Sequence, residues 1–424
     1  MTDVTRADSP SSTLGATIDD VRRQNLAQVL RLVHRDGALS RAEITRATGL
    51  NRSTIGGLVA ELGRRGLIVE QPSTSTRKVG RPSPSVAASD RAIAIAVNPE
   101  VDAIDVALVG LSGRILHRVV HRTERPPTEG EFVKVVSALI PGMSPTGGEA
   151  SILGVGIALP GLVRETDGSV ILAPHLGWRD VPLAELVEEA TGLRTVVGND
   201  ANCGVVAEST FGAGRGDGVI ISLNGGASGI GGGIVINGRL IAGQGGNAGE
   251  FGHTSVSTRG PRCHCGATGC LEAEVRRARF LAAAGLDDVE PSLVTRAMEL
   301  AWLCPTSAGG REIDRQVSCL AIALRSIVNI FNPRTVILGG YLAQLLSVVG
   351  ESEIRARTRP VLPGGSDEPM LVKPDLDDGL LLIGAAELVF GRVLGDPTVV
   401  PTRRLDTVGA RRDLAAPPTV SPPC

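Results

Sequence analysis

Three of the seven cysteines in this 424-residue chain lie within eight positions, in the segment GPRCHCGATGC. His253 precedes Cys263 by ten residues, Cys265 follows two residues later, and Cys270 five residues after that. Three thiolates and one imidazole complete the tetrahedral shell of a structural zinc ion, and the neighbouring glycines let the chain wrap closely around it. The spacing therefore predicts one structural Zn²⁺ per chain, with His264 pointing away from it. The alternative, free thiols in a loop, would expose three reactive groups.

The composition is that of an ordinary soluble globular protein, with 42% hydrophobic and 21% charged residues. The odd number of cysteines, four of them scattered singly, argues against a secreted disulfide framework. No segment approaches the roughly 18 uninterrupted apolar residues of a membrane span. We therefore expect a cytoplasmic protein with no membrane partner.

The charge is distributed unevenly along the chain. Between Val21 and Arg81 there are twelve Lys and Arg against four Asp and Glu, a local net charge of +8 in a chain whose formal net charge is −2. The remainder of the chain is therefore acidic. A basic segment joined to an acidic body indicates that only the first part meets a polyanion.

Composition and periodicity divide the chain into segments. From about residue 91, β-branched runs such as AIAIAV, ILGVGIAL and TVILGG alternate with helical stretches such as VPLAELVEEATG, which is typical of layered α/β domains. Residues 1–18 and the proline-rich tail at 396–424 are expected to be disordered. Residues 72–88, which contain a GRP sequence, are predicted to form a linker.

The basic segment at 19–71 has the pattern of a helical, winged DNA-binding module. Apolar residues at i, i+3, i+4 and i+7 from Leu26 predict the first helix. Ser40 and Glu43 form a capping box that opens the second helix, and Asn51 is the predicted cap of the third. The following LIVEQ and basic stretch would form the wing.

In a helix-turn-helix protein, the second helix of the motif enters the major groove through its amino-terminal residues. A three-helix interaction module with a solvated basic face is the alternative interpretation. The candidate contacts to bases and phosphates, including a minor-groove contact from the last residue, are Arg41, Arg52, Ser53, Thr54 and Arg81.

Several motifs resemble the ROK family, which groups repressors, open reading frames and sugar kinases. They are Glu250-x-Gly252-His253, the following CxCGxxGCLE, and the preceding VGNDAN at 197–202. With the helix-turn-helix and GRP in front, the chain is most similar to the family's transcriptional repressors of carbohydrate metabolism. The likeness runs from about residue 22 to 395.

The resemblance implies an actin-like, two-lobed sugar-kinase fold of the ribonuclease H-like class, α/β in character, behind the amino-terminal winged-helix module. The expected small lobe spans 89–198 and the large lobe, with the zinc knuckle, spans 199–395. The final helix, at about 380–395, is expected to pack back on the small lobe.

The resemblance also implies sugar-hydroxyl contacts by Asn199, Asp200, Glu250, His253 and Glu272. Carboxylates and an amide suit vicinal hydroxyls, because they accept or share their protons. His253 could hold zinc through one ring nitrogen and present the other to a hydroxyl. The alternative for each carboxylate is a surface or capping role.

A working kinase of this family needs Asp200 as a general base and two phosphate-binding loops. The glycine-rich second loop is present at 223–234, but the first has Asn98, Pro99 and Glu100 where an acid, glycines and a threonine are expected. Proline lacks an N–H and stiffens the turn, and a carboxylate repels phosphate. We therefore expect no enzymatic activity, with Asp200 as a binding group.

Together these features predict a sequence-specific DNA-binding regulator, a repressor of carbohydrate uptake or metabolism genes. Its partners would be operator DNA, a sugar or sugar-phosphate effector, and further copies of itself in a homodimer or homotetramer. It would be a bacterial cytoplasmic protein, associated with the nucleoid when bound to DNA. Two alternatives remain: a sugar kinase with an appended DNA-binding module, and a constitutive DNA-binding protein with a vestigial cleft.

Overall fold

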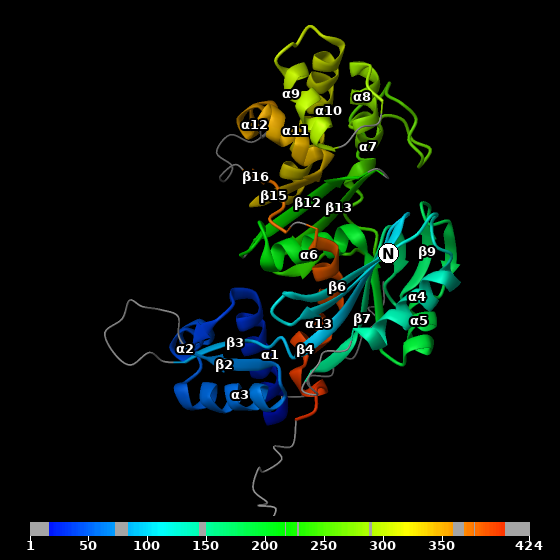
Figure 1. Cartoon of the computed structure of the whole chain (residues 1–424). Coiled ribbons are helices and arrows are strands. Elements are labelled where there is room, and N and C mark those ends of the chain that lie inside the picture. Colours follow the sequence, from blue (N-terminus) through cyan, green and yellow to red (C-terminus); the bar gives the residue numbers. More distant parts are fainter. Residues whose placement is uncertain are drawn as a thin grey trace, which may run out of the picture.

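The chain forms a small amino-terminal head and a body of two lobes, each built on a five-stranded sheet (Figure 1). The GRP sequence with Arg81, and most of the two predicted disordered termini, lie outside the described residues. The computed structural model describes residues 17–72, 84–143, 150–216, 218–226, 229–287, 291–358, 369–376 and 378–402.

The head is a winged helix-turn-helix. Ser40 accepts a hydrogen bond from the Glu43 backbone N–H in the predicted capping box, and Asn51 caps the third helix. A left-handed Gly49, with φ 72°, ends the second helix and allows the tight turn. The elements of the head are α1 (Ile18–Asp36), β1 (Leu39–Ser40), α2 (Arg41–Thr48), α3 (Arg52–Arg64), β2 (Ile68–Gln71) and β3 (Ser85–Ala88).

The last part of the predicted linker at 72–88 is not a linker. Residues 85–88 form β3, which pairs antiparallel with β2 and with β1. Val86 and Ala88 are buried on one face of this strand while its other residues are half-buried, and this alternation fixes the strand against the head. The wing is therefore a β-hairpin whose second strand leads directly into the body.

The first lobe carries a mixed sheet in the order β11-β7-β4-β5-β6. β4, β7 and β11 run parallel, and β5 and β6 continue the sheet antiparallel. The sheet strands are β4 (Ala92–Pro99), β5 (Ala103–Gly110), β6 (Ile115–Arg122), β7 (Ser151–Leu159) and β11 (Thr195–Asn199). The covering elements are α4 (Glu129–Gly142), α5 (Leu183–Thr191) and a small sheet of β8 (Leu162–Arg164), β9 (Ser169–Ala173) and β10 (Trp178–Val181).

The second lobe carries a sheet in the order β14-β13-β12-β15-β16, with helices packed on it. The strands are β12 (Val219–Gly225), β13 (Ile230–Ile236), β14 (Arg239–Leu240), β15 (Thr335–Gly340) and β16 (Met370–Val372). The helices are α8 (Arg277–Ala284), α9 (Pro291–Trp302), α10 (Ala308–Phe331), α11 (Tyr341–Val349) and α12 (Glu351–Thr358).

Two helices join the parts. α6 (Asp200–Phe211) packs on β12 and β13 of the second lobe and also on α13 (Leu380–Gly395). α13 lies against β4 and β7 of the first lobe and also contacts α1 of the head (Figure 1). A Cβ at Gly384 would lie 2.2 Å from the Cys203 carbonyl oxygen, so glycine permits the close crossing of these two helices.

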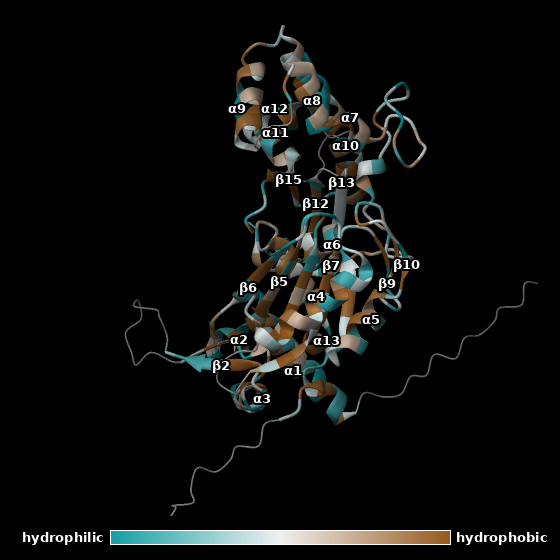
Figure 2. Ribbon diagram, turned by 45° about the vertical axis from the view of Figure 1, so that its right-hand side comes forward, coloured by the Kyte–Doolittle hydropathy of each residue, from teal (hydrophilic) through white to brown (hydrophobic). Residues whose placement is uncertain are grey.

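The head and the first lobe share one hydrophobic core. Buried residues of α1, α3, β3 and α13 form a single cluster with those of β4 and β5. Figure 2 shows α1 and α13 next to each other, below the first sheet. The head is therefore packed against the body, although the sequence predicts a linker between them.

The start of the predicted disordered tail at 396–424 is ordered. Residues Pro397–Val399 form a 3₁₀ helix (η2) that contacts α1, and Val400 is buried. The Arg65 guanidinium donates hydrogen bonds to the carbonyl oxygens of Thr398 and Val400, at 3.1 and 2.5 Å. These bonds satisfy backbone carbonyls of a segment that the proline-rich composition predicts to be disordered. No helix in the described part of the chain is both long enough and apolar enough to span a membrane.

Candidate ligand cleft and metal site

The structure brings the four predicted metal ligands together. The ligand atoms of His253, Cys263, Cys265 and Cys270 all lie within 4.8 Å of one another. The Cys263 sulfur is 3.6 Å from His253 Nδ1, and the sulfurs of Cys265 and Cys270 are 3.7 Å apart. One imidazole and three sulfurs at this separation fit the tetrahedral shell of zinc.

The local backbone explains the glycines of this segment. The chain folds into a short hairpin in which Arg262 pairs with Thr268 and Ser255 pairs with Cys270. Gly269, with φ 73°, lies so close to the Ser257 carbonyl that a Cβ would be 1.8 Å from its oxygen. Only glycine fits there, which explains the residue directly before the last cysteine.

Glu272 is buried in α7 (Leu271–Glu274), a helix that begins immediately after Cys270. The Cys263 thiol donates to its Oε1 at 2.9 Å, and His264 Nδ1 lies 2.8 Å from the same oxygen. The prediction that His264 points away from the metal site is therefore wrong. Its side chain is 65% exposed, but the ring turns inward because the Glu272 carboxylate offers a charged partner.

His253 is oriented as the sequence interpretation requires. Its Nδ1 faces the cysteine cluster, and its Nε2 lies 3.9 Å from Glu250 Oε2. Glu250 directly precedes η1 (Phe251–His253), the single 3₁₀ turn that presents both side chains. Burial and the Glu272 carboxylate raise the pKa of the Cys263 thiol, an effect that a bound divalent cation reverses because its thiolate ligands are deprotonated.

Asn199 and Asp200 stand where β11 ends and α6 begins. The Asn199 side chain caps α6 by accepting from the Asn202 backbone N–H at 3.0 Å, and its amide nitrogen donates to the Gly161 carbonyl at 3.0 Å. Asn199 therefore holds the loop after β7 against the helix start. The predicted sugar contact from its remaining donor and acceptor capacity stays a prediction.

Asp200 has an unusual electrostatic environment. Burial raises the pKa of its carboxyl to about 6, and the charges of Glu100 and Glu250 contribute to this shift. Glu100 follows β4 and Glu250 precedes η1, so the three carboxylates come from separate segments. A raised pKa with named charged neighbours is typical of a binding or catalytic position.

The predicted first phosphate loop is a tight hairpin between β4 and β5. The Glu100 N–H donates to the Ala103 carbonyl at 2.7 Å, and the Asn98 side chain donates to the Glu100 carboxylate at 2.9 Å. Pro99 has no N–H to offer. Pro99 and Glu100 therefore offer no free backbone N–H to a phosphate at this turn.

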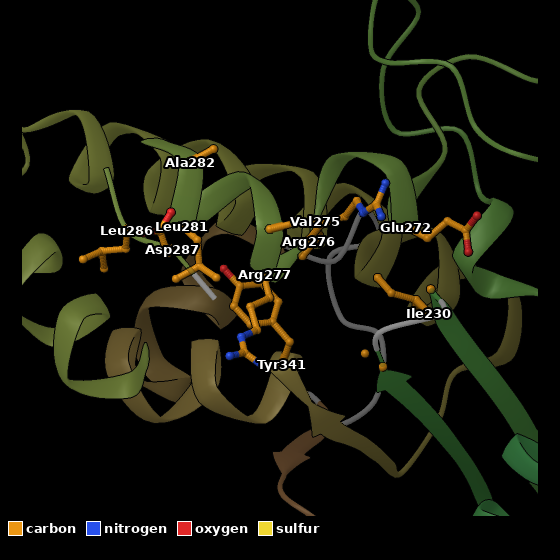
Figure 3. Close-up of a pocket in the computed structure, with 14 residues that line it drawn as sticks. Ile230, Glu272, Val275, Arg276, Arg277, Leu281, Ala282, Leu286, Asp287 and Tyr341 are labelled. Carbon is orange, nitrogen blue, oxygen red and sulfur yellow. The ribbon is translucent and has the colours of Figure 1, made fainter. Parts of the chain in front are cut away.

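The glycines of the second loop have a packing role. A Cβ at Gly233 would lie 2.4 Å from the Val205 side chain, and one at Gly231 would lie 3.0 Å from Ala201, both on α6. A pocket of about 520 Å³ opens next to this loop, with Arg276, Arg277 and Tyr341 among its lining residues and Glu272 at its other side (Figure 3). The glycines thus explain the close approach of β13 to α6 without a bound phosphate.

Four of the five predicted DNA contacts lie at the starts of α2 and α3. Arg52 and Ser53 are exposed in the first turn of α3, and Thr54 is half-buried. Ser53 donates to the Asn51 side chain at 2.7 Å, and Arg41 pairs with Glu70 of the wing strand β2. Arg81 lies outside the described residues. These roles stay predictions.

Sequence reasoning missed the buried contacts that hold the head. His34 Nε2 lies 3.1 Å from Glu387 Oε2, and its Nδ1 lies 2.6 Å from the Leu111 carbonyl oxygen. Both side chains are less than a tenth exposed. The pair is separated by 353 positions, so no local pattern could have indicated it.

A winged helix-turn-helix packed on a two-lobed α/β body defines a class of DNA-binding proteins with a ligand-binding body. The model of the ROK family matches residues 94–392, so the chain belongs to that family.

The chain is 28% identical over 342 residues to the xylose repressor of Caldicellulosiruptor bescii. The aligned region covers 75% of this chain and 83% of the relative. It is 31% identical to the glucokinase of Thermotoga maritima, over 68% of this chain and 95% of the enzyme. The crystal structure of a ROK family transcriptional regulator, a homologue of the E. coli MLC protein, matches with a TM-score of 0.70 and 25% identity, covering 88% of this chain and 97% of that one. The predicted family and fold class are confirmed.

Proposed function

We propose that the protein is a sugar-responsive transcriptional repressor of carbohydrate uptake or metabolism genes. One observation carries the proposal: a winged helix-turn-helix is packed on the helix α13, which also contacts the helix α6 that presents Asp200 to the cleft. Asp200, Glu250, His253 and Glu272 would bind sugar hydroxyls, with Asn199 positioning the edge of the cleft. The similarity to a xylose repressor supports this assignment.

His253, Cys263, Cys265 and Cys270 would hold a structural zinc ion. With all four positions of the tetrahedron filled by the protein, the ion would fix the loop and leave no open site for chemistry. Cys270 directly precedes α7, so the fixed loop would in turn place Glu272. The ion would also set the direction of the second ring nitrogen of His253.

Sugar binding would reach the head through α6 and α13. A change in the angle between the lobes would shift α6, whose neighbour α13 contacts α1 through the His34–Glu387 pair and through the Arg31 side chain, which donates to the Leu394 carbonyl at 2.8 Å. In a dimer, such a shift would change the spacing of the two recognition helices and lower operator affinity.

The proposal excludes phosphoryl transfer. The exclusion of phosphoryl transfer is supported by the hairpin at Asn98, Pro99 and Glu100. This hairpin offers a carboxylate where a kinase of the family would hold phosphate. The second candidate function, a kinase with an appended DNA-binding module, is favoured by the 520 Å³ pocket beside the glycine-rich loop. A coupled assay with ATP and a panel of hexoses separates the two, because turnover above background would support the kinase.

The decisive experiment measures operator binding during titration with candidate sugars. The native protein should release operator DNA with at least one of them, whereas Glu250→Gln should keep operator affinity and lose the response. Arg52→Ala provides the opposite control, because it should weaken operator binding and leave sugar binding unchanged in calorimetry. If none of the sugars changes operator affinity, the proposed effector function is wrong.

The metal is tested separately by Cys265→Ser. This variant should lose stoichiometric zinc in elemental analysis and show a lower melting temperature, because structural zinc sites contribute directly to folding. Cys304→Ser, which changes an exposed cysteine outside the metal site, is the matched control and should retain the metal. Native protein that folds and responds to sugar without zinc would contradict the assignment.

A further inference from the structure

Two carboxylates follow strands that end at one edge of the first sheet, on either side of β7. β4, β7 and β11 are parallel, with Val97 opposite Ile157 and Asn199 opposite Leu159. β4 and β11 therefore end at the same level on either side of β7. Glu100 and Asp200 are the first residues beyond these two strands, so both lie at this edge, and the Glu100 charge acts on the Asp200 carboxyl.

No basic group neutralises this pair in the described part of the chain. Glu100 accepts a hydrogen bond from the neutral Asn98 amide at 2.9 Å, and Asp200 accepts from the Ala201 backbone at 2.8 Å. Neither forms an ion pair with a described residue. Glu250 adds a third negative charge that acts on Asp200.

Two backbone positions of this edge offer no N–H to an anion. Pro99 has no N–H, and the Glu100 N–H is already donated to the Ala103 carbonyl. A sugar hydroxyl can donate to the Asp200 carboxylate, but a phosphate oxygen at that position accepts hydrogen bonds only and is repelled by the Glu100 charge. The edge is therefore suited to a neutral polyol and unsuited to its phosphate ester.

We propose that the effector is an unphosphorylated sugar, and that Glu100 rejects sugars that carry a phosphate on the hydroxyl nearest Asp200. This inference rests on the proposed function, because it assigns the chemical class of ligand for the same cleft. Glu100 acts here as a repulsive specificity element: it lowers the affinity for the wrong ligand and adds little to the affinity for the right one. The effect weakens at high ionic strength, because Glu100 is exposed and its charge is screened.

The test is calorimetry of the full-length protein with xylose, glucose and N-acetylglucosamine, and with glucose 6-phosphate and N-acetylglucosamine 6-phosphate. The native protein should bind at least one neutral sugar, and bind any phosphate ester at least about tenfold more weakly. Glu100→Gln should leave the affinity for the neutral sugar unchanged. It should reduce the ratio of the neutral-sugar affinity to the phosphate-ester affinity by about fivefold. Glu189→Gln, which removes one exposed charge from α5, should not alter the ratio.

Each outcome bears on a different claim. Equal or tighter binding of a phosphate ester by the native protein overturns this inference and leaves the proposed sugar response intact. A ratio that Glu100→Gln does not change, in a variant that melts like the native protein, removes the role assigned to Glu100. If none of the five compounds binds, both this inference and the proposed function fail.

Discussion

The two ends of the first lobe contain opposite arrangements of charge. At the junction with the head, His34 meets Glu387, and inside the head Glu61 accepts hydrogen bonds from both Arg22 and Arg65. At the proposed ligand cleft, the charges of Glu100 and Glu250 act on Asp200, and neither Glu100 nor Asp200 has a basic partner among the described residues. Opposite charges stabilise a fixed contact. Like charges that lie close together lower the stability of the fold until a ligand donates a hydrogen bond to the Asp200 carboxylate.

The comparison predicts that damage at the junction costs stability and damage at the cleft does not. Phe390 of α13 is fully buried in the core shared by head and lobe. Phe390→Ala should lower the free energy of unfolding by about 4 kcal/mol, because it leaves a cavity the size of a phenyl ring. Chemical denaturation measures this loss, and operator binding should weaken with it.

Val120→Ala is the matched control for this core substitution. Val120 is 43% exposed on β6, so its truncation should change the free energy of unfolding by no more than about 0.5 kcal/mol. A loss below about 1 kcal/mol in Phe390→Ala would show that the head and the lobe do not share a core in solution.

The second prediction concerns the His34–Glu387 pair. Burial alone lowers the pKa of His34, but the Glu387 charge and the hydrogen bonds that the ring donates to Glu387 and to the Leu111 carbonyl outweigh it and raise the pKa above 6.5. Glu387→Gln leaves a buried imidazole without its counter-charge and should lower the free energy of unfolding by about 3 kcal/mol in mildly acidic solution. Glu299→Gln, which breaks an exposed pair with Arg296, should cost less than about 1 kcal/mol.

The pH dependence gives this prediction its sign. Because the pKa of His34 is higher in the folded protein than in the unfolded chain, the pair contributes its full stability below pH 6.5 and loses it as pH rises through the raised value. The difference between native protein and Glu387→Gln should therefore shrink as pH increases, in denaturation curves recorded at several pH values. A constant difference would mean that His34 does not change its protonation state over that pH range.

Local features of the molecule were predictable from the sequence because their partners are close in the chain. The caps at Ser40 and Asn51 and the cluster of His253 with three cysteines follow from spacing alone. The predicted boundaries of the linker and the tail were wrong because segments elsewhere in the chain hold β3 and η2. β3 pairs with β1 and β2, and Arg65 binds the carbonyl of Thr398 in η2. The inward turn of His264 also failed, since it depends on where α7 places Glu272.

The cleft could be predicted only in part. The resemblance to a family supplied Asp200 and Glu250, and the sequence revealed the missing phosphate turn at Pro99. The sequence did not show that Glu100 and Asp200 lie at the same edge of one sheet, on either side of β7. That requires the strand order β11-β7-β4 and its register. Strand order in a parallel sheet is set by packing between distant segments, which a single sequence does not display.

The last prediction tests whether the cleft reduces stability, as the comparison requires. Asp200 ionises at about pH 6 in the folded protein against a reference value of 3.8, so its charge costs roughly 3 kcal/mol above that pH. Asp200→Asn should therefore raise the free energy of unfolding by about 2 kcal/mol at neutral pH, after a small loss from removing a negative charge at the start of α6. It should also abolish sugar binding.

The sign again follows from the shift. The folded state binds the Asp200 proton more tightly than the unfolded chain, so the native protein loses stability as pH rises from about 4 to about 6 and then levels off. The advantage of Asp200→Asn should grow over that interval and stay constant above it, with Asp19→Asn, an exposed aspartate in the first turn of α1, as control. A variant less stable than the native protein at neutral pH would show that the gathered carboxylates are already compensated, and the contrast between junction and cleft would disappear.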